Sequence, residues 1–147
     1  MEAILTDDIF VSDDKSRLQL DRICKLLKTS YWANERDRDT IRRSIENSLC
    51  FGVYYGEEQI GFARCVTDYA TMFWLADVMI DEGYRGKGIG KTLIETILRH
   101  EKLQGLTATL ATRDAQGFYS RYGFEPVDVR YYRKRLPPEP EEERQPK

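Results

Sequence analysis

The stretch "RGKGIGKT", residues 85–92, decides how the chain is interpreted, because glycine-rich basic loops often hold phosphate groups. It follows the apolar run "FWLADVMID" (73–81), and helical spacing of apolar residues begins within it and continues to about Leu103. The chain therefore passes from a strand into a helix through a glycine loop. N–H groups in the first turn of a helix lack intrahelical partners, and the helix dipole favours an anion there. The stretch predicts a phosphate-binding turn.

Two common phosphate motifs do not fit this stretch. A P-loop has the spacing G-x-x-x-x-G-K-[ST], which requires a glycine where the chain has Arg85. A dinucleotide fingerprint has the spacing G-x-G-x-x-G, whereas Gly86, Gly88 and Gly90 alternate at every second residue. A nucleoside-triphosphate binder is therefore the weakest of the alternatives.

The loop resembles the [RQ]-x-x-G-x-[GA] motif of the GCN5-related N-acetyltransferases (GNAT), with Arg85, Gly88 and Gly90 at the matching positions. A second stretch, "GFYSRYGFEP" (117–126), resembles the F-Y-x-x-x-G-F signature of the same family. The resemblance covers roughly residues 8–135 and implies acetyl-CoA as co-substrate. The coenzyme-binding residues it implies are Val78, Met79, Ile80, Arg85, Gly86, Lys87, Gly88, Ile89, Gly90, Lys91 and Thr112.

The pattern of elements predicts a mixed α/β fold, with a mostly antiparallel central sheet and helices on both faces. We expect strands at 8–14, 49–55, 60–68, 73–81, 106–112 and 125–136, and helices at 17–28, 39–47, 88–103 and 115–122. The strand at 73–81 is apolar nearly throughout, so we expect it to be central and covered on both faces. Asp39 and Asp114 are the expected N-caps of the second and fourth helices, and Gly123 suits a left-handed exit from the fourth.

The resemblance implies that Tyr119 is the general acid, which protonates the leaving thiolate of the coenzyme. Asp77 is the candidate general base, because a carboxylate in an apolar strand costs free energy unless it is paired or hydrated. A structural ion pair with Arg64 is the equal alternative for Asp77. Thr112 stands where many family members have Asn. Thr can hydrogen-bond but has a shorter reach, so the alternative is that this coenzyme contact is lost or passes to Asp114.

The loop "TSYWANERDR" (29–38) has no apolar periodicity and contains the large aromatics Tyr31 and Trp32. In the family this region borders the acceptor pocket, and aromatic walls can hold a cationic amine. Arg64 and Asp68 are the polar candidates for the same pocket. Core packing of Trp32 and solvation of the charges are the alternatives.

Composition limits the remaining function classes. The 147 residues suit one domain, and a net charge of −2 with scattered basic residues argues against nucleic acid as a partner. A single histidine and three widely spaced cysteines predict no metal site; we expect buried thiols at Cys24, Cys50 and Cys65, and His100 on the surface. We expect no membrane contact and a cytoplasmic location, because neither a spanning apolar run nor a signal peptide is apparent.

We therefore expect a single GNAT domain at 1–136 and a loose, charged, proline-rich tail at 137–147. The expected activity is transfer of an acetyl group from acetyl-CoA to a primary amine of a small molecule or peptide, by direct attack. The alternative is a non-catalytic acyl-CoA sensor on the same fold. The segment "VDVRYYRK" could pair with a second copy, so monomer and homodimer both stay open.

Overall fold

The computed structural model describes residues 1–6 and 8–138, which fall into two compact units. The first unit ends at Thr112 and the second begins at Arg113. Most of the expected tail, from residue 139 onward, lies outside the described residues.

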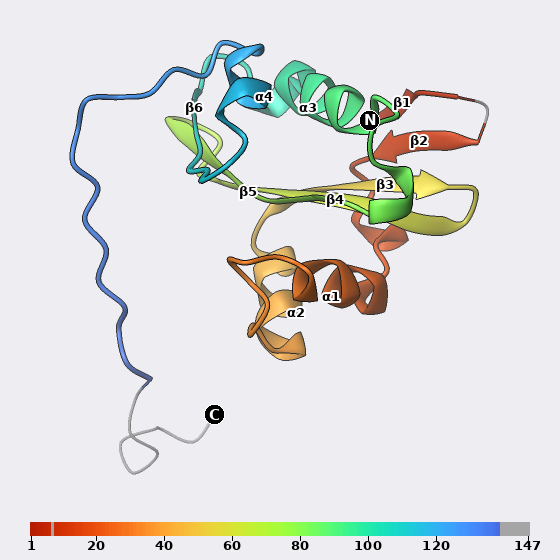
Figure 1. The fold of residues 1–147 in the computed structure, drawn as a ribbon, viewed down its shortest axis with the longest axis horizontal. Coiled ribbons are helices and arrows are strands. Elements are labelled where there is room, and N and C mark those ends of the chain that lie inside the picture. The colour runs from red at the N-terminus through yellow and green to blue at the C-terminus, as the bar shows by residue number, and fades with distance from the viewer. Residues whose placement is uncertain (7, 139–147) are drawn as a thin grey trace. The chain divides into compact units, whose positions relative to one another are not determined.

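The first unit is built on a mixed sheet, shown in Figure 1. Neighbouring strands pair in chain order and are antiparallel, except that the last two are parallel. The mixed, mostly antiparallel sheet predicted from the sequence is thus confirmed. The strands within the described residues are β1 (Glu2–Ile4), β2 (Ile9–Ser12), β3 (Leu49–Tyr55), β4 (Glu58–Thr67), β5 (Met72–Ile80) and β6 (Thr107–Thr109).

Helices cover both faces of this sheet. In Figure 1, α1 (Leu20–Lys28) and α2 (Arg38–Glu46) lie on one face and α3 (Ile89–Arg99) lies on the other. Successive side chains of a strand point to opposite faces, so the sheet packs against both helix layers. In β3, Cys50 joins the core under α1 and α2, while its neighbour Phe51 contacts His100 beyond the end of α3. The short 3-10 helices are η1 (Lys15–Arg17), η2 (Glu82–Tyr84) and η3 (Glu101–Leu103).

The core beneath α1 and α2 is apolar. Its members are Ile23, Leu26, Leu27, Ala33, Ile41, Ile45, Cys50, Phe62 and Met79. Burial raises the pKa of the Cys50 thiol to about 11 and that of Cys65 to about 12, so both stay protonated at neutral pH. Both are free and buried as expected, whereas Cys24 is only partly buried.

Strand β5 carries buried side chains on both of its faces. Phe73, Leu75, Asp77 and Met79 are its buried residues. The pairing with β4 shifts by one residue between Ala76 and Met79, so the buried residues before and after the shift lie on opposite faces of the sheet. Met79 belongs to the core beneath α1 and α2, whereas Leu75 pairs with Cys65 on the other face.

Two of the predicted helix caps are wrong. Helix α2 is capped by Asp37, whose carboxylate accepts a hydrogen bond from the Thr40 N–H at 2.8 Å, while Asp39 pairs with arginines one turn later. In the second unit, α4 (Gln116–Ser120) begins after Ala115 without a side-chain cap, so Asp114 does not cap it. Gly123 has the expected left-handed backbone, with φ of 87°.

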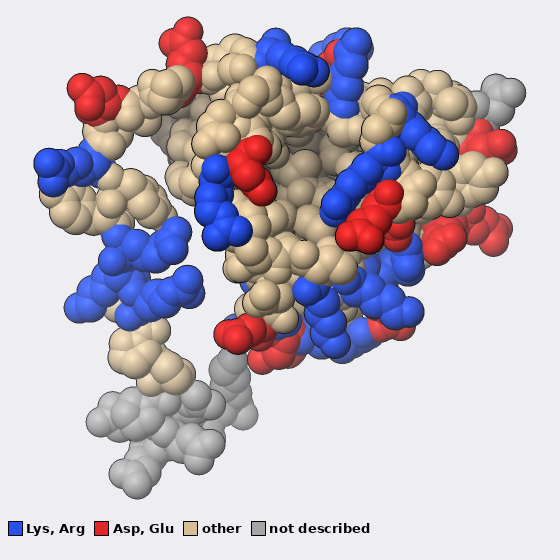
Figure 2. Space-filling model, in the orientation of Figure 1, with Lys and Arg blue, Asp and Glu red and all other residues tan. Residues whose placement is uncertain are grey.

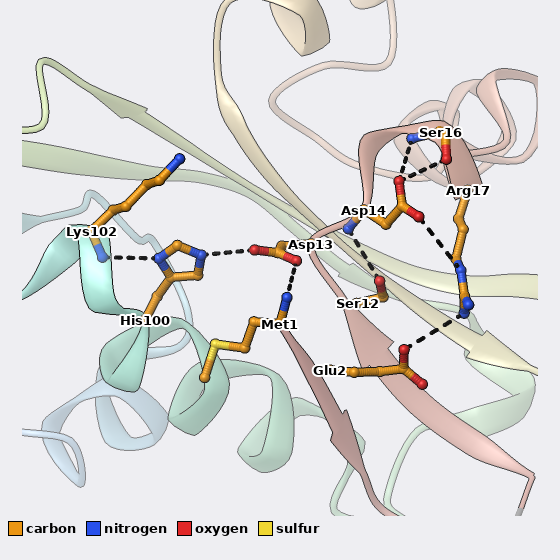
Figure 3. Close-up of polar contacts among 9 residues, drawn as sticks. All are labelled: Met1, Glu2, Ser12, Asp13, Asp14, Ser16, Arg17, His100 and Lys102. Carbon is orange, nitrogen blue, oxygen red and sulfur yellow. Dashed lines mark hydrogen bonds and ion pairs between the residues drawn. The ribbon is translucent and has the colours of Figure 1, made fainter.

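His100 was predicted to lie on the surface and instead is buried, with 3% of its area exposed. Figure 3 shows its polar contacts. Its Nδ1 accepts the Lys102 N–H at 3.2 Å, which leaves the proton on Nε2 to donate to the Asp13 carboxylate at 2.8 Å. The Met1 ammonium donates to the other oxygen of Asp13 at 2.5 Å. The histidine thereby joins the end of α3 to the chain that follows β2.

The predicted strand at 125–136 is not formed. Within the described residues no strand pairs with it, and its apolar side chains Val127, Val129, Tyr131, Tyr132 and Leu136 are exposed. Figure 2 shows basic side chains along this segment. Alternating sequence alone does not make a strand, because the backbone needs a neighbour to complete its hydrogen bonds.

Candidate coenzyme and acceptor site

Strands β5 and β6 separate soon after they begin. They pair in parallel from Met72 with Thr107 to Trp74 with Thr109, and β6 ends there. Among the described residues, β5 has a strand neighbour beyond Trp74 only on its β4 side. The β6-facing edge from Leu75 to Ile80 is therefore open, and an extended ligand can pair with such an edge as an added strand.

A bulge lies in the middle of this open segment. Phe62 of β4 pairs with Met79 and Arg64 with Ala76, so Asp77 and Val78 oppose the single residue between those two positions of β4. Asp77 has φ of 54°, a left-handed conformation that non-glycine residues rarely adopt. Bulges re-aim side chains, and this one places a carboxylate inside the α1–α2 face of the sheet.

The Asp77 carboxylate is only 2% exposed and receives three hydrogen bonds. Its Oδ1 accepts from the Trp32 indole N–H at 2.9 Å. Its Oδ2 accepts from Arg36 Nη1 and from Arg64 Nε, both at 2.9 Å. The ion pair with Arg64, one of the two sequence-based alternatives, is present.

Arg36 was missed in the sequence, although a signal was available. A buried carboxylate in an apolar strand needs cationic partners, and Arg36 lies four residues beyond Trp32 in the loop already assigned to the acceptor. Trp32 itself is 41% exposed and Tyr31 is 44% exposed, with their rings edge to face at 5.0 Å. Trp32 is thus anchored through its nitrogen and is not a core residue.

Asp68 has a structural task in the turn between β4 and β5. It accepts hydrogen bonds from the Thr71 N–H and hydroxyl and from the Ala70 N–H, and these bonds lower the pKa of its carboxyl. The same turn holds Tyr69 at φ of 60°. These contacts account for Asp68 without an acceptor.

The glycine loop leads from the open edge of β5 into α3. Gly86 and Gly88 both have φ of 79°, and Gly88 is the N-cap of α3, with no side chain capping the helix. The first helical bond runs from the Thr92 N–H to the Gly88 carbonyl at 3.2 Å, so the N–H groups of residues 89–91 precede the helical ladder. Their arrangement suits an anion.

The entrance to this loop is held by Asp81 and Arg22. One Asp81 oxygen accepts the Gly83 N–H at 2.9 Å, and the other accepts Arg22 Nη2 of α1 at 3.0 Å. Arg85 folds back so that its Nε donates to the Ile80 carbonyl at 3.2 Å. Between α1 and the end of β5 lies a hollow of about 210 Å³, lined by Arg22, Lys25, Leu26, Thr29, Ile80, Asp81 and Glu82.

Comparison with known proteins identifies this architecture. The family model described as "Acetyltransferase (GNAT) domain" matches residues 46–126. The chain belongs to the GNAT acetyltransferase family. It is similar to a solved GNAT-family protein of Xanthomonas campestris pv. campestris, with a TM-score of 0.79 and 39% identity over 84% of this chain and 93% of that one.

Two curated acetyltransferases are also similar to the chain. The ycf52-like N-acetyltransferase of Prochlorococcus marinus is 30% identical over 84% of this chain and 73% of its own length. Histone acetyltransferase TAP1 of Glycine max is 33% identical over 74% of this chain and 46% of its own length. The chain spans 42% to 73% of the length of the first four curated relatives.

The second unit contains the stretch "GFYSRYGFEP", which resembles the second family signature. Tyr119 is half-buried on α4, and its ring lies 5.1 Å from that of Phe118 and 5.9 Å from that of Phe124. Thr112, the last residue of the first unit, is also half-buried.

Two negative findings concern residues 1–6 and 8–138. No group of three or more His, Cys, Asp or Glu side chains in these ranges could hold a metal ion. No helix in them is long and apolar enough to cross a bilayer.

Proposed function

We propose that the protein transfers the acetyl group of acetyl-CoA to a primary amine by direct attack. The observation that carries the proposal is that the open edge of β5 runs through the glycine loop into the uncapped N-terminus of α3. An extended arm ending in a diphosphate has the chemistry to match both features.

The coenzyme contacts follow from this arrangement. The pantetheine arm would pair with Val78, Met79 and Ile80, and a backbone N–H there would stabilise the oxyanion of the tetrahedral intermediate. The diphosphate would lie against the N–H groups of residues 86–91, with Arg85, Lys87 and Lys91 adding positive charge. Thr112 would contribute a hydroxyl contact.

The acetyl transfer needs an acid for the thiolate and a base for the amine. Tyr119 is proposed as the acid on the strength of the signature that contains it, because a phenol keeps its proton at neutral pH. The amine would lose its proton to water or to Asp77, and Tyr31, Trp32 and Arg64 would border the acceptor. The cytoplasmic location and the oligomeric state stay predictions.

The test is to mix the protein with acetyl-CoA and a panel of primary amines and to follow the release of free thiol. Calorimetry with coenzyme A alone measures binding separately. We expect coenzyme binding together with amine-dependent thiol release. Absence of coenzyme binding would end the proposal.

A non-catalytic acyl-CoA sensor is the second candidate, favoured by one observation. The Asp77 carboxylate is held in a buried ion pair with Arg36 and Arg64 and accepts a third hydrogen bond from Trp32, which suits a structural role better than a general base. A sensor would bind coenzyme A in the calorimeter and release no thiol with any amine.

A further inference from the structure

The cluster around Asp77 carries an excess of positive charge. Two guanidinium groups, from Arg36 and Arg64, share one carboxylate oxygen, and the third donor, Trp32, is neutral. Among the described residues, neither arginine pairs with a second acid, since the other contact of Arg64 is to the hydroxyl of Ser48 at 3.2 Å. The cluster therefore keeps one net positive charge beside the open edge of β5.

The exposed fraction of each side chain indicates which of the two arginines a ligand can contact. The exposed fraction of the side chain rises from 2% at Asp77 to 14% at Arg64 and 24% at Arg36. Arg36 uses Nη1 for Asp77, which leaves its Nε and Nη2 as donors. Arg36 also comes from the same loop as the exposed rings of Tyr31 and Trp32. The guanidinium of Arg36 is held by Asp77 through Nη1, and part of the side chain is exposed to solvent.

A fixed guanidinium binds a carboxylate or another oxyanion well, because its donors lie in a planar fork and it retains its charge. A purely cationic amine would instead meet like charge at this point. The same positive field favours the neutral form of an amine held nearby, which is the form that attacks a thioester. A molecule with an amine and an acid satisfies both requirements.

We infer that the acceptor carries an acidic group close to its amine, and that Arg36 binds this group and determines specificity. The inference rests on the proposed function, because it names the class of acceptor for the same site. It selects amino-acid-like acceptors over simple polyamines.

The experiment compares amines that differ only by a carboxylate: tyrosine with tyramine, and lysine with cadaverine. We expect kcat/KM to be at least about tenfold higher for the acid-bearing member of a pair. Arg36→Ala should bring this ratio close to one, chiefly through KM, and Arg36→Lys should keep part of it. Each ratio is measured within one variant, so a loss of folded protein does not affect it.

Arg38→Ala is the matched control, since Arg38 is an exposed arginine two residues away that pairs with Asp21. It should keep the wild-type ratio. Calorimetry with the same four compounds, with and without coenzyme A, measures the preference without turnover. A binding preference that depends on Arg36 without acetyl transfer would sustain the inference and defeat the proposed function.

Three outcomes overturn the inference. In the first, the wild-type protein shows no preference within a pair, or neither member of any pair binds or reacts. In the second, Arg36→Ala preserves the preference and leaves the affinity for coenzyme A unchanged. In the third, Arg36→Ala preserves the preference but weakens the affinity for coenzyme A, which would assign Arg36 to the coenzyme.

Discussion

At the scale of single residues, the geometry of the acceptor side depends on Asp77. Asp77→Asn removes the charge that holds two arginines together, and its amide N–H₂ must face either the arginines or the Trp32 N–H, all of which are donors. Breaking a buried ion pair on one side is expensive, so we expect a loss of about 3 kcal/mol in the free energy of unfolding. Urea unfolding measures it.

Asp68→Asn is the control for this substitution, because Asp68 lies exposed in a turn and its effect should be smaller. An Asp77→Asn protein that unfolds at the same urea concentration as wild type would show that the Asp77 cluster does not stabilise the fold.

Tyr119 is the second residue with a separable role. Tyr119→Phe keeps the ring contacts with Phe118 and Phe124 and removes only the hydroxyl. We expect kcat to fall about 100-fold while the Kd for coenzyme A is unchanged, because general acids contribute on this order. Tyr122→Phe, which removes a neighbouring hydroxyl, should keep full turnover. Undiminished kcat in Tyr119→Phe would contradict the acid role.

Asp13 gives a pH-dependent prediction. Burial acts to raise its pKa, but hydrogen bonds from the Met1 ammonium and His100 outweigh burial and hold the pKa below its ordinary value of 3.8. A lowered pKa in the folded state stabilises the protein above the ordinary value, and this stabilisation disappears as pH falls through the folded-state pKa.

Asp13→Asn should therefore be less stable than wild type by about 2 kcal/mol at pH 7. The difference should shrink as the pH is lowered below about 3.8. Denaturant unfolding of both proteins across this range measures the difference. A gap that stays constant to the lowest pH would show that the carboxylate charge is not what stabilises the network.

At the scale of elements, the backbone conformation at the N-terminus of α3 can be tested directly. Gly88 has φ of 79°, and no atom lies within 4 Å of the place that a Cβ would take, so Gly88→Ala would be strained by its backbone and not by a clash. We expect relaxation of this strain to turn the N–H groups of α3 and to weaken coenzyme A binding about tenfold by calorimetry.

Gly83→Ala is the matched control in the preceding turn. Gly83 does not have a positive φ, and an added Cβ would meet only the Asp81 carboxylate at 3.4 Å. Coenzyme affinity should stay near wild type. If both variants bind equally well, the loop conformation at Gly88 is not what holds the diphosphate.

The elements themselves were predictable where the sequence carries a long local pattern. Strand β5 and the start of helix α3 were placed within one residue of their observed positions, because an apolar run and a helical period are local signals. The end of α3 was placed four residues too late, since the chain continues from Arg99 into the 3-10 helix η3. The three-residue strand β1 was missed, since it is defined by its pairing with β2. The opposite error occurred at 125–136, where alternation is present and a pairing partner is not.

At the scale of the whole molecule, the family and the fold class were predictable, and the organisation of the acceptor side was predictable only for the pair of Arg64 with Asp77. The two motifs are contiguous in sequence, whereas Arg36 and Asp77 are 41 residues apart and meet only through a bulge in the register of β4 and β5. His100 and Asp13, which are 87 residues apart, show the same limit. Local patterns do not encode such pairings.

Coenzyme binding should also be visible in the stability of the whole chain. A ligand that binds only the folded state at 100 times its Kd adds about 2.7 kcal/mol to the free energy of unfolding. For a chain of this size that corresponds to a rise in Tm of roughly 6 °C. Thermal unfolding with coenzyme A, and with ATP at the same concentration, measures it. We expect protection by coenzyme A alone, because the open β5 edge can pair with a pantetheine arm that ATP lacks. Protection by ATP alone would instead return the glycine loop to the nucleotide-binding class, despite the missing glycine at Arg85.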